Sequence, residues 1–229
     1  MNAPPNAPPN APPNVPPNVP PNVPPNVPTN AAQSRRTLVF GGARSGKSAY
    51  AEQQALAAAR SGAGEIVCIA TADRNASAAD AEMAARIAHH RQRREALGSR
   101  WRTVEEPLAL GQALRANAGP GKVVLVDCLT VWLSNLLFAE GHAFPELGPI
   151  AAPAAFALQR EDFLGALQEA QGTVILVSNE VGMGIVPIGA VSRWFVDEAG
   201  RLNQSVAAIC ERVQWVAAGL PLSFKDASC

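Results

Sequence analysis

The residues best suited to chemistry in this sequence form one short run that begins at Gly41. The run matches the phosphate-binding P-loop pattern G-x-x-x-x-G-K-S at every position and reads Gly41-Gly42-Ala43-Arg44-Ser45-Gly46-Lys47-Ser48. Glycines let backbone N–H groups converge on phosphate oxygens, and the positive end of a following helix adds to the attraction. We expect the whole run to contact nucleotide, with Lys47 at the β- and γ-phosphates and the Ser48 hydroxyl on Mg²⁺.

The segments on either side of this run bear on whether it binds nucleotide or matches by chance. Residues 37–40 are apolar and β-prone, and residues 49–57 are good helix formers. Strand, glycine-rich loop and helix is the context in which the motif binds phosphate, whereas an accidental glycine-rich turn does not require it. The flanking segments therefore favour nucleotide binding.

A single acidic residue, Asp127, ends the apolar run of residues 123–126. In P-loop proteins, an acid at the end of another strand supplies a second group near Mg²⁺. The alternative is that Asp127 caps the helix expected to begin near Val131. The presence of the P-loop favours the metal role, so Ser48 and Asp127 are the predicted Mg²⁺ ligands.

A second polar cluster follows another apolar run and reads Ser178-Asn179-Glu180-Val181-Gly182-Met183-Gly184. Polar groups followed by two glycines at a strand end are typical of a loop that approaches a ligand closely. An ordinary turn with glycine at positive φ gives the same pattern. The residues alone do not separate these two interpretations.

The most basic part of the chain is a predicted helix that carries two adjacent histidines. At 100° per residue, one stripe of this helix holds Met83, Ile87, His90 and Arg94. We therefore expect His90 to face the protein and His89 to lie nearer solvent. Neighbouring arginines favour the neutral imidazole, which can attack phosphorus while the arginines hold triphosphate oxygens. The alternative is a hydrogen-bonded structural histidine on a solvated basic helix, and the residues alone favour that alternative.

Alternating strands and helices are expected to position these residues. Apolar, β-branched runs predict strands over residues 37–40, 65–71, 101–105, 123–129, 173–178 and 213–217. The stretches between them predict helices over residues 48–60, 79–97, 108–117, 131–138, 154–170 and 193–210. The pattern predicts an α/β domain with a mostly parallel sheet covered by helices on both faces. In such sheets ligands bind beyond the carboxyl ends of the strands, where the P-loop, Asp127 and Asn179 fall.

Composition narrows the class of protein further. The chain of 229 residues carries 19 basic and 19 acidic side chains, and this zero net charge argues against non-specific nucleic-acid binding. No apolar run is long enough to span a bilayer, so no membrane insertion is expected. The four cysteines and three histidines show no metal-ligand spacing, which predicts reduced thiols in a cytoplasmic protein.

Residues 2–30 are an uncharged repeat built mainly of proline, asparagine, alanine and valine. Proline fixes φ and removes a hydrogen-bond donor, so residues 1–34 are expected to form an extended, disordered tail. A ligand for a proline-binding module is the functional alternative, and a solvated repeat is favoured over it. The folded domain is predicted to cover residues 35–229.

Several segments, taken in order along the chain, resemble one known family. They are residues 41–48, the helix with Glu82-Met83 and His89-His90-Arg91, and residues 101–105, 126–130, 179–187 and 200–204. Residues 36–225 thereby resemble the bifunctional adenosylcobinamide kinase / adenosylcobinamide-phosphate guanylyltransferase family of cobalamin synthesis. The most specific parts are the paired histidines and Asn179-Glu180-Val181-Gly182-Met183-Gly184-Ile185-Val186-Pro187, since a P-loop alone occurs in many families.

The resemblance implies a RecA-like P-loop fold, a homotrimer and two activities. Enzymes of this family phosphorylate adenosylcobinamide with ATP or GTP. They then transfer GMP from GTP to adenosylcobinamide phosphate through a histidine–GMP intermediate and release pyrophosphate. Carried over, His90 is the guanylylated residue and acts with Lys47 as the catalytic pair. Arg91 and Glu105 join the P-loop and Asp127 as nucleotide contacts, and Mg²⁺ is the implied cofactor.

Two other functions remain open at this point. A P-loop kinase of another small metabolite would use the same loop, with His90 only structural. A regulatory protein that switches on phosphate occupancy would need a partner-binding module, and the chain after residue 35 has none to spare. The chain departs from the family pattern in its tail, at Ala81 and at Val196, where a basic residue is frequent. These departures affect neither the P-loop nor the histidine, and they leave the corrinoid contacts open.

Overall fold

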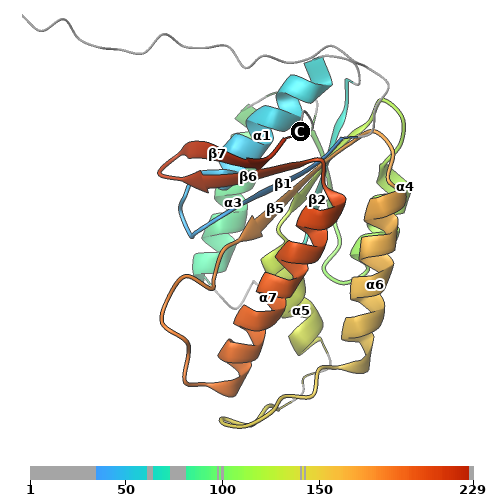
Figure 1. The fold of residues 1–229 in the computed structure, drawn as a ribbon. Coiled ribbons are helices and arrows are strands. Elements are labelled where there is room, and N and C mark those ends of the chain that lie inside the picture. The colour runs from blue at the N-terminus through green and yellow to red at the C-terminus, as the bar shows by residue number, and fades with distance from the viewer. Residues whose placement is uncertain are drawn as a thin grey trace, which may run out of the picture. The chain divides into compact units, whose positions relative to one another are not determined.

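Strands and helices alternate along the part of the chain that the computed structural model describes, residues 35–60, 64–72, 81–96, 98, 101–139, 141 and 143–226 (Figure 1). The strands are β1 (Arg35–Gly41), β2 (Ile66–Ala70), β3 (Trp101–Glu105), β4 (Val123–Asp127), β5 (Thr173–Asn179), β6 (Arg212–Ala217) and β7 (Leu220–Lys225). The helices are α1 (Lys47–Ala58), α3 (Ala81–Ala96), α4 (Leu110–Asn117), α5 (Leu129–Phe138), α6 (Ala154–Glu169) and α7 (Ala190–Ile209). These elements all fall within the unit Ala31–Cys229, and the predicted tail over residues 1–34 lies outside the described residues.

The described strands form one seven-stranded sheet in the order β3-β2-β4-β5-β1-β6-β7. Every neighbouring pair is parallel except β6 and β7, which form an antiparallel hairpin. One strand, β5, separates β1, which leads into the P-loop, from β4, which ends at Asp127. This is the strand order of a RecA-like P-loop domain, so the predicted fold is confirmed.

The register of the sheet brings the predicted strand ends to one edge. Gly41 of β1 pairs with Asn179 of β5, and Asp127 of β4 pairs with the residue two positions before Asn179. On the other side of β4, Asp127 and Glu105 of β3 share Ala70 of β2 as their partner. Because parallel strands end at the same edge of a sheet, the P-loop, Asp127 and Asn179 meet there.

Two apolar layers lie between the sheet and the helices on its two faces (Figure 1). On one face α1 covers the sheet, and the buried side chains include Val39, Ala51, Ala55, Ile66, Leu125, Ile175 and Val177. On the other face lie α4, α5, α6 and α7, and the buried side chains include Leu38, Leu114, Val126, Trp132, Phe163, Leu176 and Leu202. Central strands are therefore apolar at consecutive positions, which is why they read as continuous apolar runs in the sequence.

The structure corrects the predicted elements at their ends and adds one strand. β4 ends at Asp127, two residues before its predicted end, and α7 begins at Ala190, three residues before its predicted start. No strand was predicted at β7, which contains Pro221. At the edge of a sheet proline is tolerated. Ala218 and Gly219 form the hairpin turn with φ of 51° and 80°, the positive values that a tight two-residue turn requires.

Two further expectations concern membranes and cysteines. Within the described ranges, no helix is both long and apolar enough to cross a membrane. Cys68, Cys128 and Cys210 are free thiols as predicted, and burial raises the pKa of Cys68 and of Cys210 to about 12. Cys229 lies outside the described residues.

Candidate active site

The P-loop turns the chain sharply from β1 into α1. The turn uses a positive φ at two positions, 57° at Arg44 and 94° at Gly46, and Gly46 is the N-cap of α1. Lys47 follows as the first residue of the helix and is only 8% exposed. Its ammonium group donates a hydrogen bond to the carbonyl oxygen of Gly42 at 3.0 Å, so the side chain lies back along the loop. The lysine and the free N–H groups of the first helical turn therefore face the same small region.

The electrostatic environment prepares Lys47 to bind an anion. Burial lowers the pKa of Lys47, and the nearby Cys128 and Asp127 oppose that shift. A buried ammonium group has lost part of its hydration, so it gains more from a phosphate oxygen than a fully hydrated one would.

Two of the loop glycines are required by the protein's own packing. A Cβ on Gly41 would overlap the carbonyl oxygen of Val216, and a Cβ on Gly46 would lie 3.0 Å from the Cα of Gly219. Both neighbours belong to the β6–β7 hairpin, whose Gly219 N–H donates to a carbonyl of the P-loop at 2.8 Å. A Cβ on Gly42 would meet no atom within 4 Å. Of these three glycines, Gly42 is the one with open space for an approaching phosphate.

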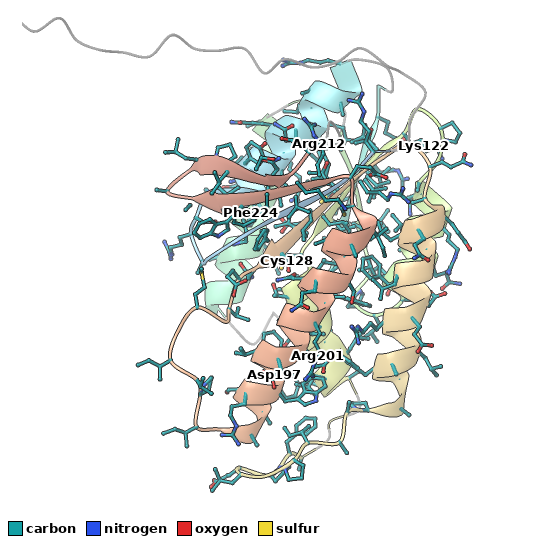
Figure 2. The ribbon with its side chains drawn as sticks, viewed as in Figure 1. Lys122, Cys128, Asp197, Arg201, Arg212 and Phe224 are labelled. Carbon is teal, nitrogen blue, oxygen red and sulfur yellow. The ribbon has the colours of Figure 1, made fainter. Side chains whose placement is uncertain are left out.

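Asp127 ends β4 at the same edge as the P-loop. The helix-capping alternative for this residue is wrong, because α5 begins at Leu129 with Cys128 as its N-cap and without a side-chain cap hydrogen bond. Figure 2 labels Cys128, which marks this edge of the sheet. The Asp127 carboxylate and the hydroxyl of Ser48, in the first turn of α1, are oxygen donors of the kind that Mg²⁺ prefers.

The His, Cys, Asp and Glu side chains of the described residues also bear on the kind of metal site that is expected. In the described part of the chain, no three or more His, Cys, Asp or Glu side chains gather as a metal site. Mg²⁺ in nucleotide enzymes is usually held by one or two protein oxygens together with phosphate oxygens and water. Ser48 and Asp127 are oxygen donors of this kind, and their role as Mg²⁺ ligands stays a prediction.

Helix α3 places His90 beside Asp127. His90 Nδ1 lies 3.6 Å from Asp127 Oδ2, an electrostatic contact slightly longer than a hydrogen bond. The same ring nitrogen lies 3.5 Å from Nη2 of Arg93, one turn further along the helix. His89 is exposed, whereas the His90 side chain is 32% exposed. The orientation predicted from the helical stripe is confirmed, and the second histidine of the pair faces the site.

Burial is the largest influence on the protonation of His90. It lowers the pKa of His90; Asp127 opposes this shift, and Arg93 adds to it. The sequence predicted a neutral imidazole from neighbouring arginines alone, and the structure shows desolvation to be the larger cause. A neutral imidazole keeps one nitrogen lone pair, which is what attack on phosphorus requires.

Two residues of the site, Glu52 and Arg93, were not singled out from the sequence. Glu52 lies on α1, is 1% exposed, and accepts a hydrogen bond at Oε2 from Arg93 Nε at 2.7 Å. Arg94 Nη1 lies 3.9 Å from Glu52 Oε1. Buried carboxylates are almost always paired with a cation. An acid among the alanines of the helix after the P-loop was the available signal, but it does not reveal which arginine is the partner.

The loop after β5 contacts the P-loop at one end and exposes apolar side chains along the rest. The N–H of Glu180 donates to the carbonyl oxygen of Gly41 at 3.0 Å. Neither Gly182 nor Gly184 has a positive φ, so the ordinary-turn alternative is wrong. The exposed apolar side chains are Val181, Met183, Ile185, Val186 and Ile188. An exposed apolar loop fixed beside a phosphate-binding loop favours the ligand-facing interpretation.

Glu105 and Arg91 were predicted nucleotide contacts on family resemblance. Glu105 ends β3, which β2 separates from β4, and it is exposed. Arg91 lies in α3 directly after the second histidine, and its side chain is outside the described part of the structure. Glu105 thus lies at the margin of the site. The predicted residues that the structure gathers at one edge are Lys47, Ser48, Asp127 and His90.

Three features together define a P-loop nucleotide-binding protein. They are a glycine-rich loop between a strand and a helix, a buried lysine, and an acid on another strand of a RecA-like sheet. A histidine at the same edge is no part of that definition and indicates a second chemistry. The sequence model of the family described as "Cobinamide kinase / cobinamide phosphate guanyltransferase" matches residues 37–224. The chain belongs to this family, as its motifs predicted.

Two relatives of bacterial origin agree with this assignment. The "Bifunctional adenosylcobalamin biosynthesis protein CobP" of Pseudomonas aeruginosa is 49% identical over 190 residues, 83% of this chain and 97% of that protein. The "Bifunctional adenosylcobalamin biosynthesis protein CobU" of Escherichia coli is 40% identical over 190 residues, 82% of this chain and 98% of that protein. Among solved structures, a KaiC-like protein of Pyrococcus horikoshii matches with a TM-score of 0.42 and 14% identity, over 80% of this chain and 71% of that one.

Proposed function

We propose that this protein is a transferase that phosphorylates adenosylcobinamide with ATP or GTP. With a further GTP it then converts the product to adenosylcobinamide-GDP and pyrophosphate. The observation that carries the proposal is the position of His90, which lies 3.6 Å from Asp127 at the same end of the sheet as the P-loop. A P-loop alone serves phosphoryl transfer, whereas a neutral histidine beside it can form a covalent link to GMP.

In the first step the acceptor is the aminopropanol hydroxyl of adenosylcobinamide. Its oxygen attacks the γ-phosphorus, the bond to the β–γ bridging oxygen breaks, and the nucleoside diphosphate and the hydroxyl proton leave. Lys47 and the backbone N–H groups of residues 42–48 hold the β- and γ-phosphate oxygens. Ser48 and Asp127 would hold Mg²⁺, which supplies positive charge to those oxygens when bound.

In the second step the lone pair of His90 attacks the α-phosphorus of GTP. A phosphorus–nitrogen bond forms, the bond to the α–β bridging oxygen breaks, and pyrophosphate leaves with that electron pair. Asp127 favours the tautomer with the proton on Nδ1, because a carboxylate attracts an N–H, and this leaves Nε2 as the nucleophile. A phosphate oxygen of adenosylcobinamide phosphate then attacks the same phosphorus and frees the histidine.

We also propose a cytoplasmic homotrimer. Its use of nucleotide substrates supports a cytoplasmic location, and strand β7 supports the assembly. β7 is the last strand at one side of the sheet, is exposed along its length, and carries the exposed side chains of Leu220 and Leu222. It also carries the exposed Phe224, which Figure 2 labels. An exposed apolar edge strand is typical of a surface that another chain covers. Sedimentation should show a species of three chains of 23.9 kDa each, and a monomer at assay concentration would contradict the trimer.

Covalent labelling by GTP with a radioactive α-phosphate tests the function. Wild-type protein should retain label after denaturation, through a bond that is acid-labile and base-stable, as expected of phosphorus–nitrogen. Adenosylcobinamide phosphate should discharge the label, and adenosylcobinamide should not. His90→Ala should lose the label yet keep measurable phosphorylation, because alanine supplies no nucleophile and the P-loop is intact. His89→Ala, the matched change on the exposed side, should keep most of the label.

Two results would contradict these roles. Label lost in His89→Ala but kept in His90→Ala would reverse the assignment of the two histidines. Phosphorylation by a wild-type protein that never takes up label would instead identify a P-loop kinase of a small metabolite without guanylyltransferase activity.

A further inference from the structure

Glu52 is the most deeply buried charged residue among those described, and neither step above uses it. It lies on α1, five residues after Lys47, and its carboxylate contacts α3. Oε2 accepts a hydrogen bond from Arg93 Nε at 2.7 Å, and Oε1 lies 3.9 Å from Arg94 Nη1. A carboxylate is expensive to bury, so its presence here needs an explanation in the residues that it holds.

Arg93 connects this carboxylate to the proposed nucleophile. Its Nε is bonded to Glu52, while its Nη2 lies 3.5 Å from His90 Nδ1. The guanidinium group is planar, so fixing Nε also fixes the direction of the two outer nitrogens. The Arg93 side chain is 29% exposed, which leaves part of the group accessible to a ligand. A fixed, accessible cation beside the Nδ1 side of the imidazole ring whose Nε2 is the proposed nucleophile is suited to binding the anion under attack.

We propose that Glu52 is a positioning residue for guanylyl transfer: it fixes Arg93 so that the guanidinium group binds α-phosphate oxygens of GTP as His90 attacks. The inference rests on the proposed function, because it needs the histidine–GMP step. In that step the phosphorus–nitrogen bond forms and the bond to pyrophosphate breaks. Arg93 stabilises the negative charge on the phosphate oxygens and neither gains nor loses a proton.

The phosphorylation step should not depend on this arrangement. Lys47 is placed by its own hydrogen bond to Gly42, and the P-loop backbone by the hairpin turn at Gly219. Neither contact involves Glu52. The neighbouring Arg94, 5% exposed, needs the carboxylate as a buried counter-charge, and this is the structural part of the role of Glu52.

The test compares Glu52→Gln, Arg93→Gln and the double variant in single-turnover labelling by GTP and in cobinamide phosphorylation. In Glu52→Gln, the glutamine keeps an oxygen that can accept a hydrogen bond from Arg93, but it removes the negative charge that holds the guanidinium group. Each single change should slow labelling about 10- to 100-fold, as loss of a supporting residue does elsewhere. Phosphorylation should stay close to wild type. The double variant should label no more slowly than the slower single variant, because both changes break one contact.

Guanidinium rescue gives a second measurement that a merely structural residue would not move. Free guanidinium ion should restore labelling to Arg93→Ala, because the Glu52 carboxylate can bind it in place of the missing side chain. The same ion should not restore labelling to the variant that carries Arg93→Ala together with Glu52→Gln. Arg93→Ala leaves the pairing of Glu52 with Arg94 in place, so rescue of this single variant by guanidinium tests the proposal even when Glu52→Gln does not fold.

The matched control is Glu211→Gln. Glu211 pairs with Arg36 near the amino-terminal end of β1, whereas the site lies at the carboxyl ends of the strands. Replacing Glu211 should therefore change neither activity. Three results would overturn the proposal. They are losses of labelling rate that multiply in the double variant, a loss of phosphorylation as large as the loss of labelling, and an Arg93→Ala protein whose labelling guanidinium does not restore. A wild-type protein that takes up no label would instead overturn the proposed function on which it rests.

Discussion

The two sides of the site are held in place by different kinds of interaction. On the P-loop side, the carbonyl groups of Gly41 and Ser45 accept backbone hydrogen bonds of 3.0 and 2.8 Å from the neighbouring loop and hairpin. On the other side, Arg93 of α3 forms an ion pair with Glu52, and the His90 ring contacts the Asp127 carboxylate. Backbone contacts survive most changes of side chain, whereas contacts between charges depend on a few particular residues.

This difference separates the two proposed activities. Phosphate binding by the P-loop is needed in both reactions, so damage on that side should impair both. The helix that carries His90 is needed only for GMP transfer, so damage there should leave phosphorylation. A site built in this way can lose the second activity without losing the first.

The largest expected effect comes from Lys47→Ala, on the P-loop side. Removing the buried ammonium group should lower phosphorylation and GMP labelling together, by about 100- to 1,000-fold, because the developing phosphate charge loses its main cation. Release of nucleoside diphosphate and retention of labelled GMP measure the two activities. Lys122→Ala, at an exposed lysine, is the control. A Lys47→Ala protein with near-normal phosphorylation would show that the P-loop has been misassigned.

A pair of glycine changes separates packing from phosphate binding within the P-loop. Gly41→Ala would push a methyl group into the backbone carbonyl of Val216 and should cost about 1–3 kcal/mol of stability, seen in thermal melting. Gly42→Ala meets no atom within 4 Å, so the melting temperature should stay the same while nucleotide affinity falls. Equal melting temperatures for the two variants would contradict the packing assigned to the hairpin.

Glu211→Gln sharpens the comparison by testing an ion pair remote from the site. Burial acts to raise the pKa of Glu211, but hydrogen bonds from Arg36 and the backbone, together with the charge of Arg36, outweigh it and lower the pKa in the folded protein. Its stabilising effect is therefore complete above the ordinary carboxyl value of 4.5 and is lost as the pH falls through the lowered pKa. The variant should be less stable by about 0.5–1 kcal/mol at pH 7, and the difference should shrink below pH 4.5. Denaturant melts at pH 7 and pH 3 measure it, and a difference that grows towards pH 3 would contradict the sign.

The smallest effect is expected from deleting residues 2–34. An uncharged repeat of proline and asparagine can bury little apolar surface, so neither side of the site should depend on it. The melting temperature should change by less than about 2 °C, and both activities should be retained. A fall of many degrees would mean that the repeat stabilises the folded domain.

The P-loop side could be predicted from the sequence because one continuous segment carries all of its information. A loop that needs glycine at fixed positions, between an apolar strand and a helix, has few alternative structures. The central strands were predicted for a similar reason, since burial on both faces makes them continuously apolar. The orientation of His90 followed from helical periodicity alone.

The rest depends on contacts between distant segments. Glu52 and Arg93 lie 41 positions apart, and nothing in either residue indicates the other as its partner. The helical stripe picked out Arg94 and the family resemblance Arg91, and only the packing of α3 on α1 shows that Arg93 contacts both Glu52 and His90. Strand β7 was not predicted, and whether its Pro221 is tolerated depends on the position of the strand in the sheet, which is a tertiary property.

The hairpin turn over the P-loop has a consequence for the gene. A stop codon after Ala217 would leave every predicted site residue in the product, yet it would remove Gly219, whose N–H supports the loop. We expect such a product to bind nucleotide weakly by calorimetry, and binding at full strength would show that the turn is dispensable.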